Sequence, residues 1–365
     1  MGGPVKRRYV IGLLVFAAAA AVASGWSYGQ GAAVSALGLG ALALLGVYIA
    51  LLGHLGDRYL RYTLVLPTTV LLGVVSVVPI AYLVHLSLRN INMVTFRRGG
   101  SFAGLDNYVE VFTRDPLFWS SLLLTVQYVI LNLAIQLALG FALALLLSNP
   151  FRGRNIVNTA LLIPVMTTPI VVATLWKYLL DYNNGGINVL LGRFLGADPV
   201  PWLTNRPLPF VESIPVVGPW LTANLNFNYA LLAITWVNVW QWTPFVFLLL
   251  YAGMQALPQD LYEAARVDGA RYWQTVRHIT LPLLAPVLSV VVLVRLVDLM
   301  KVFDQVWALF GNATFARTLN IHLYTTGLMS QNYGMGAALS VVTFTLSLII
   351  SLTYLAIVQR RRRLT

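Results

Sequence analysis

The sequence contains no cysteine and only four histidines among its 365 residues. The absence of cysteine excludes disulfide frameworks, thiolate metal sites and cysteine nucleophiles. The histidines, at positions 54, 85, 278 and 322, are widely separated, which argues against a histidine metal cluster. We therefore expect neither a metal site nor a catalytic centre of these types.

Charged residues are also scarce, at 10% of the chain, whereas 58% of its residues are hydrophobic. An ordinary soluble domain has about 25% charged residues, so this chain has too little polar material to cover a globular surface. The composition excludes a soluble enzyme and a disordered or fibrous chain, and it predicts an integral membrane protein. The net charge of +12 is then explained by basic loops that set membrane orientation, so we expect no nucleic-acid partner.

Long apolar segments recur along the chain. A bilayer core of roughly 30 Å needs about 20 apolar residues per helix, and this template predicts an all-α membrane protein with about eight transmembrane helices. The expected spans are residues 9–26, 32–54, 62–88, 118–148, 157–180, 228–253, 283–309 and 333–358. Residues 89–117 and 181–227 are too polar to span, and we expect them to form small folded caps.

The first span has two interpretations. Lys6-Arg7-Arg8, the apolar run from Tyr9 and the tripeptide Ala21-Val22-Ala23 also describe a secretory signal peptide. We favour a helix that is retained, because its removal would leave seven helices and place the amino terminus outside.

Basic residues indicate the orientation. The termini and the loops on their side of the membrane hold 14 of the 24 lysines and arginines, and the opposite loops hold seven. Because lysine and arginine accumulate on the cytoplasmic side, both termini are predicted to be cytoplasmic. The expected location is a bacterial or archaeal cytoplasmic membrane, with lipid contacts along every span.

The loop between the sixth and seventh spans is too polar for lipid and has a helical pattern. Asp260 is expected to cap a short helix, with Glu263 completing a capping box. Gly269 suits a left-handed helix end, and a second helical segment follows from Ala270 to His278. Pro282 is expected to restart the chain as it re-enters the membrane.

This loop also carries a motif. Glu263-Ala264-Ala265, Gly269 after three further residues and Ile279-Thr280-Leu281-Pro282 after nine more resemble the EAA loop of permease subunits in binding-protein-dependent ABC importers. The fixed glycine and the Ile-x-Leu-Pro element favour this interpretation over a helix that rests on lipid. The resemblance implies that the residues coupling the permease to an ATPase are Glu263, Ala264, Ala265, Asp268, Gly269, Leu281 and Pro282.

A second segment, Phe303 to Leu309, resembles the F-D-x-[IV]-W-x-[LM] element of sugar-importer permeases, although the usual T-x-G-G-P does not follow it. The resemblance implies a type-1 importer transmembrane domain over residues 118–358. Residues 1–117 would be an amino-terminal extension with about three helices, as in the eight-helix permease subunit of maltose transporters. Residues 359–365 would form a basic cytoplasmic tail.

The same resemblance implies a solute site halfway through the membrane, on the sixth and seventh spans. The implied substrate-binding residues are Asn238, Gln241, Trp242, Phe245, Arg295, Asp298 and Leu299. Amide, carboxylate and guanidinium groups can hydrogen-bond sugar hydroxyls. The alternatives stay open: Arg295 and Asp298 can instead form an ion pair that holds helices together, the aromatic residues can simply pack, and Gln127, Asn132 and Gln136 can bond between helices.

No phosphate-binding loop of the form G-x-x-x-x-G-K-[ST] occurs in the sequence, so ATP and magnesium would be bound by partner subunits and this chain needs no cofactor. The predicted function is the membrane permease of an ATP-driven importer of a di- or oligosaccharide, not an enzyme. Expected partners are a second homologous permease, two ATPase subunits and an extracytoplasmic binding protein. The alternatives are an ion-coupled transporter, a non-sugar importer permease, a membrane-embedded transferase and a purely structural subunit.

Overall fold

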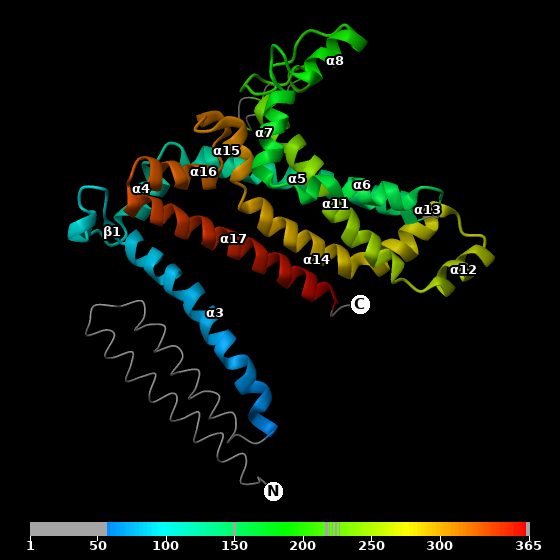
Figure 1. The fold of residues 1–365 in the computed structure, drawn as a ribbon, viewed down its shortest axis with the longest axis horizontal. Coiled ribbons are helices and arrows are strands. Elements are labelled where there is room, and N and C mark those ends of the chain that lie inside the picture. Colours follow the sequence, from blue (N-terminus) through cyan, green and yellow to red (C-terminus); the bar gives the residue numbers. More distant parts are fainter. Residues whose placement is uncertain are drawn as a thin grey trace. The chain divides into compact units, whose positions relative to one another are not determined.

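The computed structural model describes residues 57–148, 151–215, 218, 220, 222, 225 and 227–362 (Figure 1). The chain divides into two compact units, Met1–Tyr82 and Leu83–Thr365. The predicted spans at 9–26 and 32–54 lie outside the described residues, as does the end of the basic tail.

Helix α3 (Asp57–Ser87) corresponds to the predicted third span and begins in the first unit. Its segment Thr68–Ser87 is long and apolar enough to cross a membrane. From Val70 to Val78 the valine and leucine side chains are exposed, which is the distribution expected for a helix that faces lipid.

Three long helices of the second unit confirm predicted spans. These are α5 (Phe118–Ser148), α11 (Tyr229–Gln255) and α17 (Tyr333–Arg362). Helix α11 packs along α5, and Gly140 is the point of close approach, because a Cβ atom there would lie 2.6 Å from Val246 Cγ1. Most of α11 is buried within this single chain, so it forms the centre of the unit.

The prediction of one continuous fifth span over residues 157–180 is wrong, because the segment is two helices rather than one. Helices α6 (Arg154–Met166) and α7 (Pro169–Leu179) meet at an angle of 97°. Thr167 and Thr168 between them have extended backbone conformations. Pro169 explains the break, since its ring disfavours helical geometry in the preceding residue and it has no N–H to donate.

The prediction for the seventh span, residues 283–309, is wrong at both ends. Helix α14 (Leu281–Met300) stops at Lys301, and a separate helix α15 (Asp304–Phe310) follows. At the other end the helix continues back through a π-helical turn η2 (Val276–Thr280) into α13 (Tyr272–Thr275), so the chain is not restarted at Pro282. The wider π turn lies beside Pro282, where a proline removes a regular helical hydrogen bond.

The two polar connections contain short elements. Residues 89–117 form a two-stranded hairpin of β1 (Arg89–Asn90) and β2 (Ser101–Phe102), with the 3-10 turn η1 (Phe96–Arg98) between the strands and helix α4 (Asp106–Thr113) after them. The described part of 181–227 contains α8 (Gly186–Leu195) and α9 (Pro209–Glu212). The side chain of Asn188 holds two parts of this segment together: its Nδ2 donates to the carbonyl of Val200, and its Oδ1 accepts from the N–H of Val200.

The segment between α15 and α17 contains the 3-10 turn η3 (Thr314–Ala316), helix α16 (Leu319–Tyr324) and the π-helical turn η4 (Thr325–Met329). His322 on α16 lies 2.6 Å from Asp115, measured from Nε2 to Oδ2, which joins α16 to the start of α5. Partial burial lowers the pKa of the neighbouring Arg317, and the Asp115 carboxylate opposes that shift.

The main hydrophobic cluster lies where α5, α7, α11, α14 and α15 meet. In the second unit the helices α5, α11 and α14 run between one end with α15 and α16 and another with α13 and helix α12 (Gln259–Val267) (Figure 1). Two candidate sites follow from this arrangement: one inside the helix bundle and one at the α12 end.

Candidate solute-binding and coupling sites

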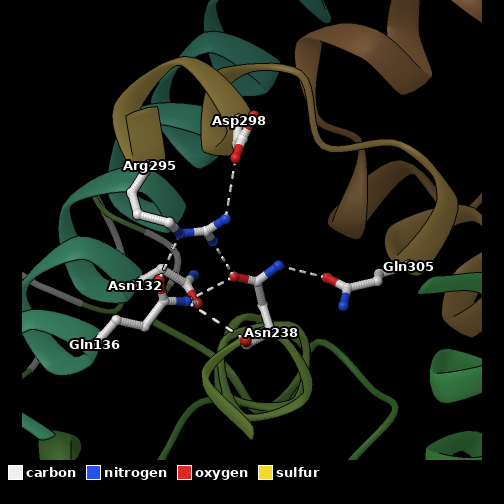
Figure 2. A network of polar contacts seen from close by, with 6 residues as sticks. All are labelled: Asn132, Gln136, Asn238, Arg295, Asp298 and Gln305. Atoms are coloured by element: carbon white, nitrogen blue, oxygen red, sulfur yellow. Dashed lines mark hydrogen bonds and ion pairs between the residues drawn. The ribbon is translucent and has the colours of Figure 1, made fainter. Parts of the chain in front are cut away.

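A buried polar network joins four helices inside the bundle. Figure 2 shows its members, which come from α5, α11, α14 and α15. They are Asn132, Gln136, Asn238, Arg295, Asp298 and Gln305. Because polar groups in an apolar interior are costly unless they are paired, such a network fixes how the helices pack.

Arg295 is the hub of this network, with its side chain only 1% exposed. Its Nε donates to Gln136 Oε1 at 2.9 Å, and its terminal nitrogens reach Asn238 Oδ1 at 3.1 Å and Asp298 Oδ2 at 3.4 Å. The guanidinium carbon also lies 4.8 Å from the ring centroid of Trp242. The cation is therefore held by an ion pair, two amide oxygens and an aromatic face.

The network continues through side-chain amides towards the break between α6 and α7. Asn238 Nδ2 donates to Gln305 Oε1 at 2.6 Å, and Gln305 Nε2 donates to Gln241 Oε1 at 2.5 Å. Gln241 Nε2 then donates to the backbone carbonyl of Thr167 at 2.7 Å. One chain of hydrogen bonds thus connects Arg295 with the broken helix.

The seven predicted solute residues lie in different environments. Asn238, Gln241 and Arg295 are buried in the network, and Leu299 packs in the hydrophobic cluster. Trp242 and Phe245 are partly exposed and contact each other edge to face. Asp298 is 47% exposed, on the same face of α14 as exposed Val290 and Val294. The structure thus brings Asn238, Gln241, Trp242, Arg295 and Asp298 together, and of these Trp242 and Asp298 have accessible surface.

Two members of the network have no assigned role from sequence. Gln305 lies in the Phe303–Leu309 motif, but nothing in that pattern indicates that its amide lies between Asn238 and Gln241. The carbonyl of Thr167 is free to accept because the chain is extended there. The proline at position 169 was the available signal for that break.

The polar loop forms the second site. Helix α12 ends as expected, with Gly269 at φ 73°. The N–H of Gly269 bonds the carbonyl of Arg266, and the N–H of Ala270 bonds that of Ala265, which is a Schellman motif. The predicted cap is wrong, because the helix starts one residue before Asp260 and no side chain caps it. Pro258 at the N-cap position supplies the turn into the helix instead.

Most residues of helix α12 are exposed, and Asp260, Glu263, Ala264 and Val267 form one exposed stripe along it. These positions follow the i, i+3, i+4, i+7 spacing of one helical stripe. Ala265 lies on another side and is only 8% exposed. Ala264 is therefore the small residue that a partner can reach, while Ala265 lets the helix approach the rest of its own chain.

Of the remaining coupling residues, Asp268 is the exposed C-cap residue of α12. The other two lie at the junction of the loop with the membrane helix. Leu281 and Pro282 begin α14 and are exposed. Tyr262 on α12 lies within hydrogen-bond distance of Thr280, with 3.1 Å between the hydroxyl oxygens. This contact joins α12 to the start of the spanning helix.

Comparison with known proteins gives the family. Residues 136–363 match the model for the binding-protein-dependent transport system inner membrane component. The chain belongs to this family, and so it is the permease subunit of a binding-protein-dependent ABC importer. It is a transporter subunit rather than an enzyme, and its family works with a solute-binding protein and separate ATPase chains.

Several curated relatives align along most of their length. The chain is 34% identical over 307 residues to the trehalose/maltose transport system permease protein MalF of Thermococcus litoralis, covering 84% of this chain and 96% of the relative. It is 31% identical over 291 residues to the trehalose transport system permease protein SugA of Mycobacterium tuberculosis, covering 80% and 86% respectively. These alignments decide against the ion-coupled transporter and the membrane-embedded transferase.

The fold resembles a chain of a bacterial ABC transporter that imports the acidic polysaccharide alginate. That match has a TM-score of 0.66 and 23% identity, and it covers 83% of this chain and 96% of the other. The type-1 importer fold that the EAA loop predicts is thereby confirmed.

Proposed function

We propose that this chain forms the translocation pathway for a sugar, a di- or oligosaccharide, in an ATP-driven importer. The relatives named for trehalose and maltose support the solute class. The observation that carries the proposal is Asp298, a half-exposed carboxylate on a membrane helix, held beside a buried arginine. Ionisable groups within membrane helices almost always face a cavity or a partner.

In this proposal the network supports the site, and a few groups contact the solute. Asp298 accepts hydrogen bonds from sugar hydroxyls, and the rings of Trp242 and Phe245 cover the apolar face of a pyranose. Arg295 orients Asp298 from behind, and Asn238 and Gln136 hold Arg295. Gln241 supports Asn238 through Gln305. Leu299 contributes packing that keeps this part of α14 in place.

The cavity needs a second wall, because the exposed face of α14 that carries Asp298 is not covered by the described helices of this chain. We assign that wall to a second, homologous permease subunit. Two ATPase subunits, which bind ATP and magnesium, would dock on the exposed face of α12. Glu263 would pair with a basic residue there, and Gly269, Leu281 and Pro282 would transmit the movement of the docked helix into α14.

Transport then proceeds by alternating access. A binding protein delivers the sugar to the side of the membrane where α8 and α15 lie, and ATP-driven closure of the ATPase pair moves α12. That movement opens the pathway to the delivered sugar, and hydrolysis returns it to the opposite orientation. We place both termini and α12 in the cytoplasm of a bacterial or archaeal cell.

The test is ATP hydrolysis by the complete complex in lipid vesicles, measured with its binding protein and a panel of sugars. Trehalose, maltose and longer oligosaccharides are compared with amino acids and inorganic anions. We expect at least one sugar to stimulate hydrolysis several-fold and to be accumulated. Stimulation by an amino acid or an anion, with no response to any sugar, would overturn the sugar assignment.

A further inference from the structure

A cavity of about 470 Å³ lies beneath α12, bordered by that helix, by the ends of α5 and α11, and by α13. Its volume falls within the range of about 300–1,000 Å³ that is usual for small-molecule sites. It lies at the α12 end of the bundle, and none of the residues that line it belongs to the Arg295 network.

The lining of this cavity is rich in hydrogen-bonding groups. Gln255, Gln259 and Arg266 line it, and their side chains have no hydrogen-bond or ion-pair partner among the described residues. The hydroxyls of Tyr262 and Thr275 add further polar positions. Amides, hydroxyls and one guanidinium beside aromatic rings are groups that bind a polyhydroxylated molecule.

The charged residues in the lining indicate which class of ligand the cavity can bind. Arg266 is the single charged side chain, and no acidic residue lines the cavity. Cations are therefore disfavoured. Three apolar residues, Leu145, Met254 and Val276, supply a patch of the kind that a sugar ring can cover.

The cavity uses a different face of α12 from the stripe of Asp260, Glu263, Ala264 and Val267. Gln259, Tyr262 and Arg266 follow the spacing i, i+3, i+7 and line the cavity. The exposed stripe is the one that contains Glu263 and Ala264. A molecule in the cavity can therefore be bound while a partner protein holds the other face.

We propose that this cavity binds a neutral sugar from the side of the membrane where α12 lies, and that the bound sugar restrains the movement of α12 against α13 and α11. This inference rests on the proposed function, since the sugar in the cavity is then the imported solute, which inhibits its own importer after release. The Tyr262–Thr280 contact links α12 to α14 at the cavity wall, so a ligand there acts on the element that transmits movement.

The test uses the absence of cysteine from the chain. The Thr275→Cys variant of the complete complex is reconstituted in vesicles with α12 on the outside. It is then alkylated with N-ethylmaleimide, either with trehalose or maltose in the outer solution or without sugar. We expect the alkylation rate to fall at least about threefold with sugar. Gln359→Cys, on the exposed end of α17, is the matched control and should show no change.

A second variant separates direct binding from a distant effect. Adding Gln255→Leu to Thr275→Cys removes one hydrogen-bonding group from the cavity, so protection should be lost. Equal alkylation rates with and without sugar would overturn the proposal, as would protection that survives Gln255→Leu. Protection by inorganic phosphate but not by sugar would also overturn it.

The same vesicles distinguish this proposal from the function on which it depends. Sugar and binding protein enclosed in the lumen should stimulate ATP hydrolysis, and sugar added outside should reduce that stimulated rate at least about twofold. Stimulation without protection of Thr275→Cys overturns the cavity proposal alone. Absence of stimulation by any sugar overturns the proposed function itself.

Discussion

Arg295 and Asp298 lie three residues apart on α14, yet their surroundings differ sharply. The arginine side chain is enclosed by Gln136, Asn238 and Trp242, whereas almost half of the aspartate side chain is accessible. A buried cation with several partners holds helices together, and an accessible carboxylate is free to bind a solute. The two alternatives for this pair, a solute site and a scaffold, therefore apply to different residues.

This difference predicts opposite effects for two substitutions. Arg295→Leu leaves Gln136 Oε1 buried without its donor and removes hydrogen bonds made by a charged group, at a cost on the order of 3 kcal/mol. We expect a lower unfolding temperature of the purified complex and a reduced yield. Asp298→Asn removes only a long, partly exposed ion pair, which is worth about 0–1 kcal/mol.

For Asp298→Asn we accordingly expect assembly and unfolding temperature close to those of the wild type, with sugar uptake reduced at least about tenfold. The measurements are thermal unfolding in detergent and uptake into vesicles. If Asp298→Asn transports normally and Arg295→Leu assembles normally, neither residue has the role given to it here.

At the scale of single elements, α12 shows how much the sequence reveals. The sequence predicted the helix and the left-handed Gly269, but the restart of the chain at Pro282 was wrong, because the membrane helix is continuous back to Tyr272. It did not predict which alanine is exposed, because that depends on how the helix lies against α13 and α14. A pattern of nine residues does not specify such tertiary packing.

The long helices followed from apolar length alone, whereas the breaks did not. Residues 157–180 are apolar throughout apart from a few polar side chains, so length predicts one span, but Pro169 and the extended Thr167 and Thr168 bend the chain. Gln305 illustrates the same limit at the site. Its bonds to Asn238 and Gln241 exist only because α15 folds back after α14 ends.

The exposed face of α12 gives a prediction about coupling. Ala264→Trp places a large side chain on the face that a partner reaches, so we expect ATPase co-purification to fall severalfold while the permease stays inserted. Leu261→Trp, on the same helix but outside that face, is the matched control and should retain the ATPase. Equal co-purification for both variants would place the coupling contact elsewhere.

The crossing of η4 and α17 gives a second prediction at this scale. A Cβ atom at Gly336 would lie 2.3 Å from Gly327 Cα, so backbone would have to move to accommodate it. Gly336→Ala should therefore destabilise the protein by about 1–3 kcal/mol, as overpacking does. Gly73→Ala in α3 has no atom within 4 Å of the new Cβ, and it should stabilise the helix by about 0.5–1 kcal/mol. Thermal unfolding of both variants checks the contrast.

At the scale of the whole molecule, α11 separates the two polar regions that carry the proposed functions. Its 27 residues correspond to about 40 Å of helix, enough to cross the hydrocarbon core. The segment with α8 precedes it, and α12 follows it. A single crossing therefore puts α8 and α12 on opposite sides of the membrane.

The bias of basic residues predicts which of these two sides is cytoplasmic. Because the chain has no cysteine, single introduced cysteines can test that orientation. The termini and the loops on the α12 side together carry twice as many lysines and arginines as the loops on the α8 side, so α12 is predicted to be cytoplasmic. Trp273→Cys, at a residue 71% exposed beside α12, should resist a membrane-impermeant maleimide added to intact cells. Leu195→Cys, at the 74% exposed end of α8, should be labelled. After the cells are permeabilised both should react, which excludes steric protection as the cause of the difference. Labelling of Trp273→Cys from outside, with Leu195→Cys protected, would invert the topology and remove α12 from the reach of a cytoplasmic ATPase.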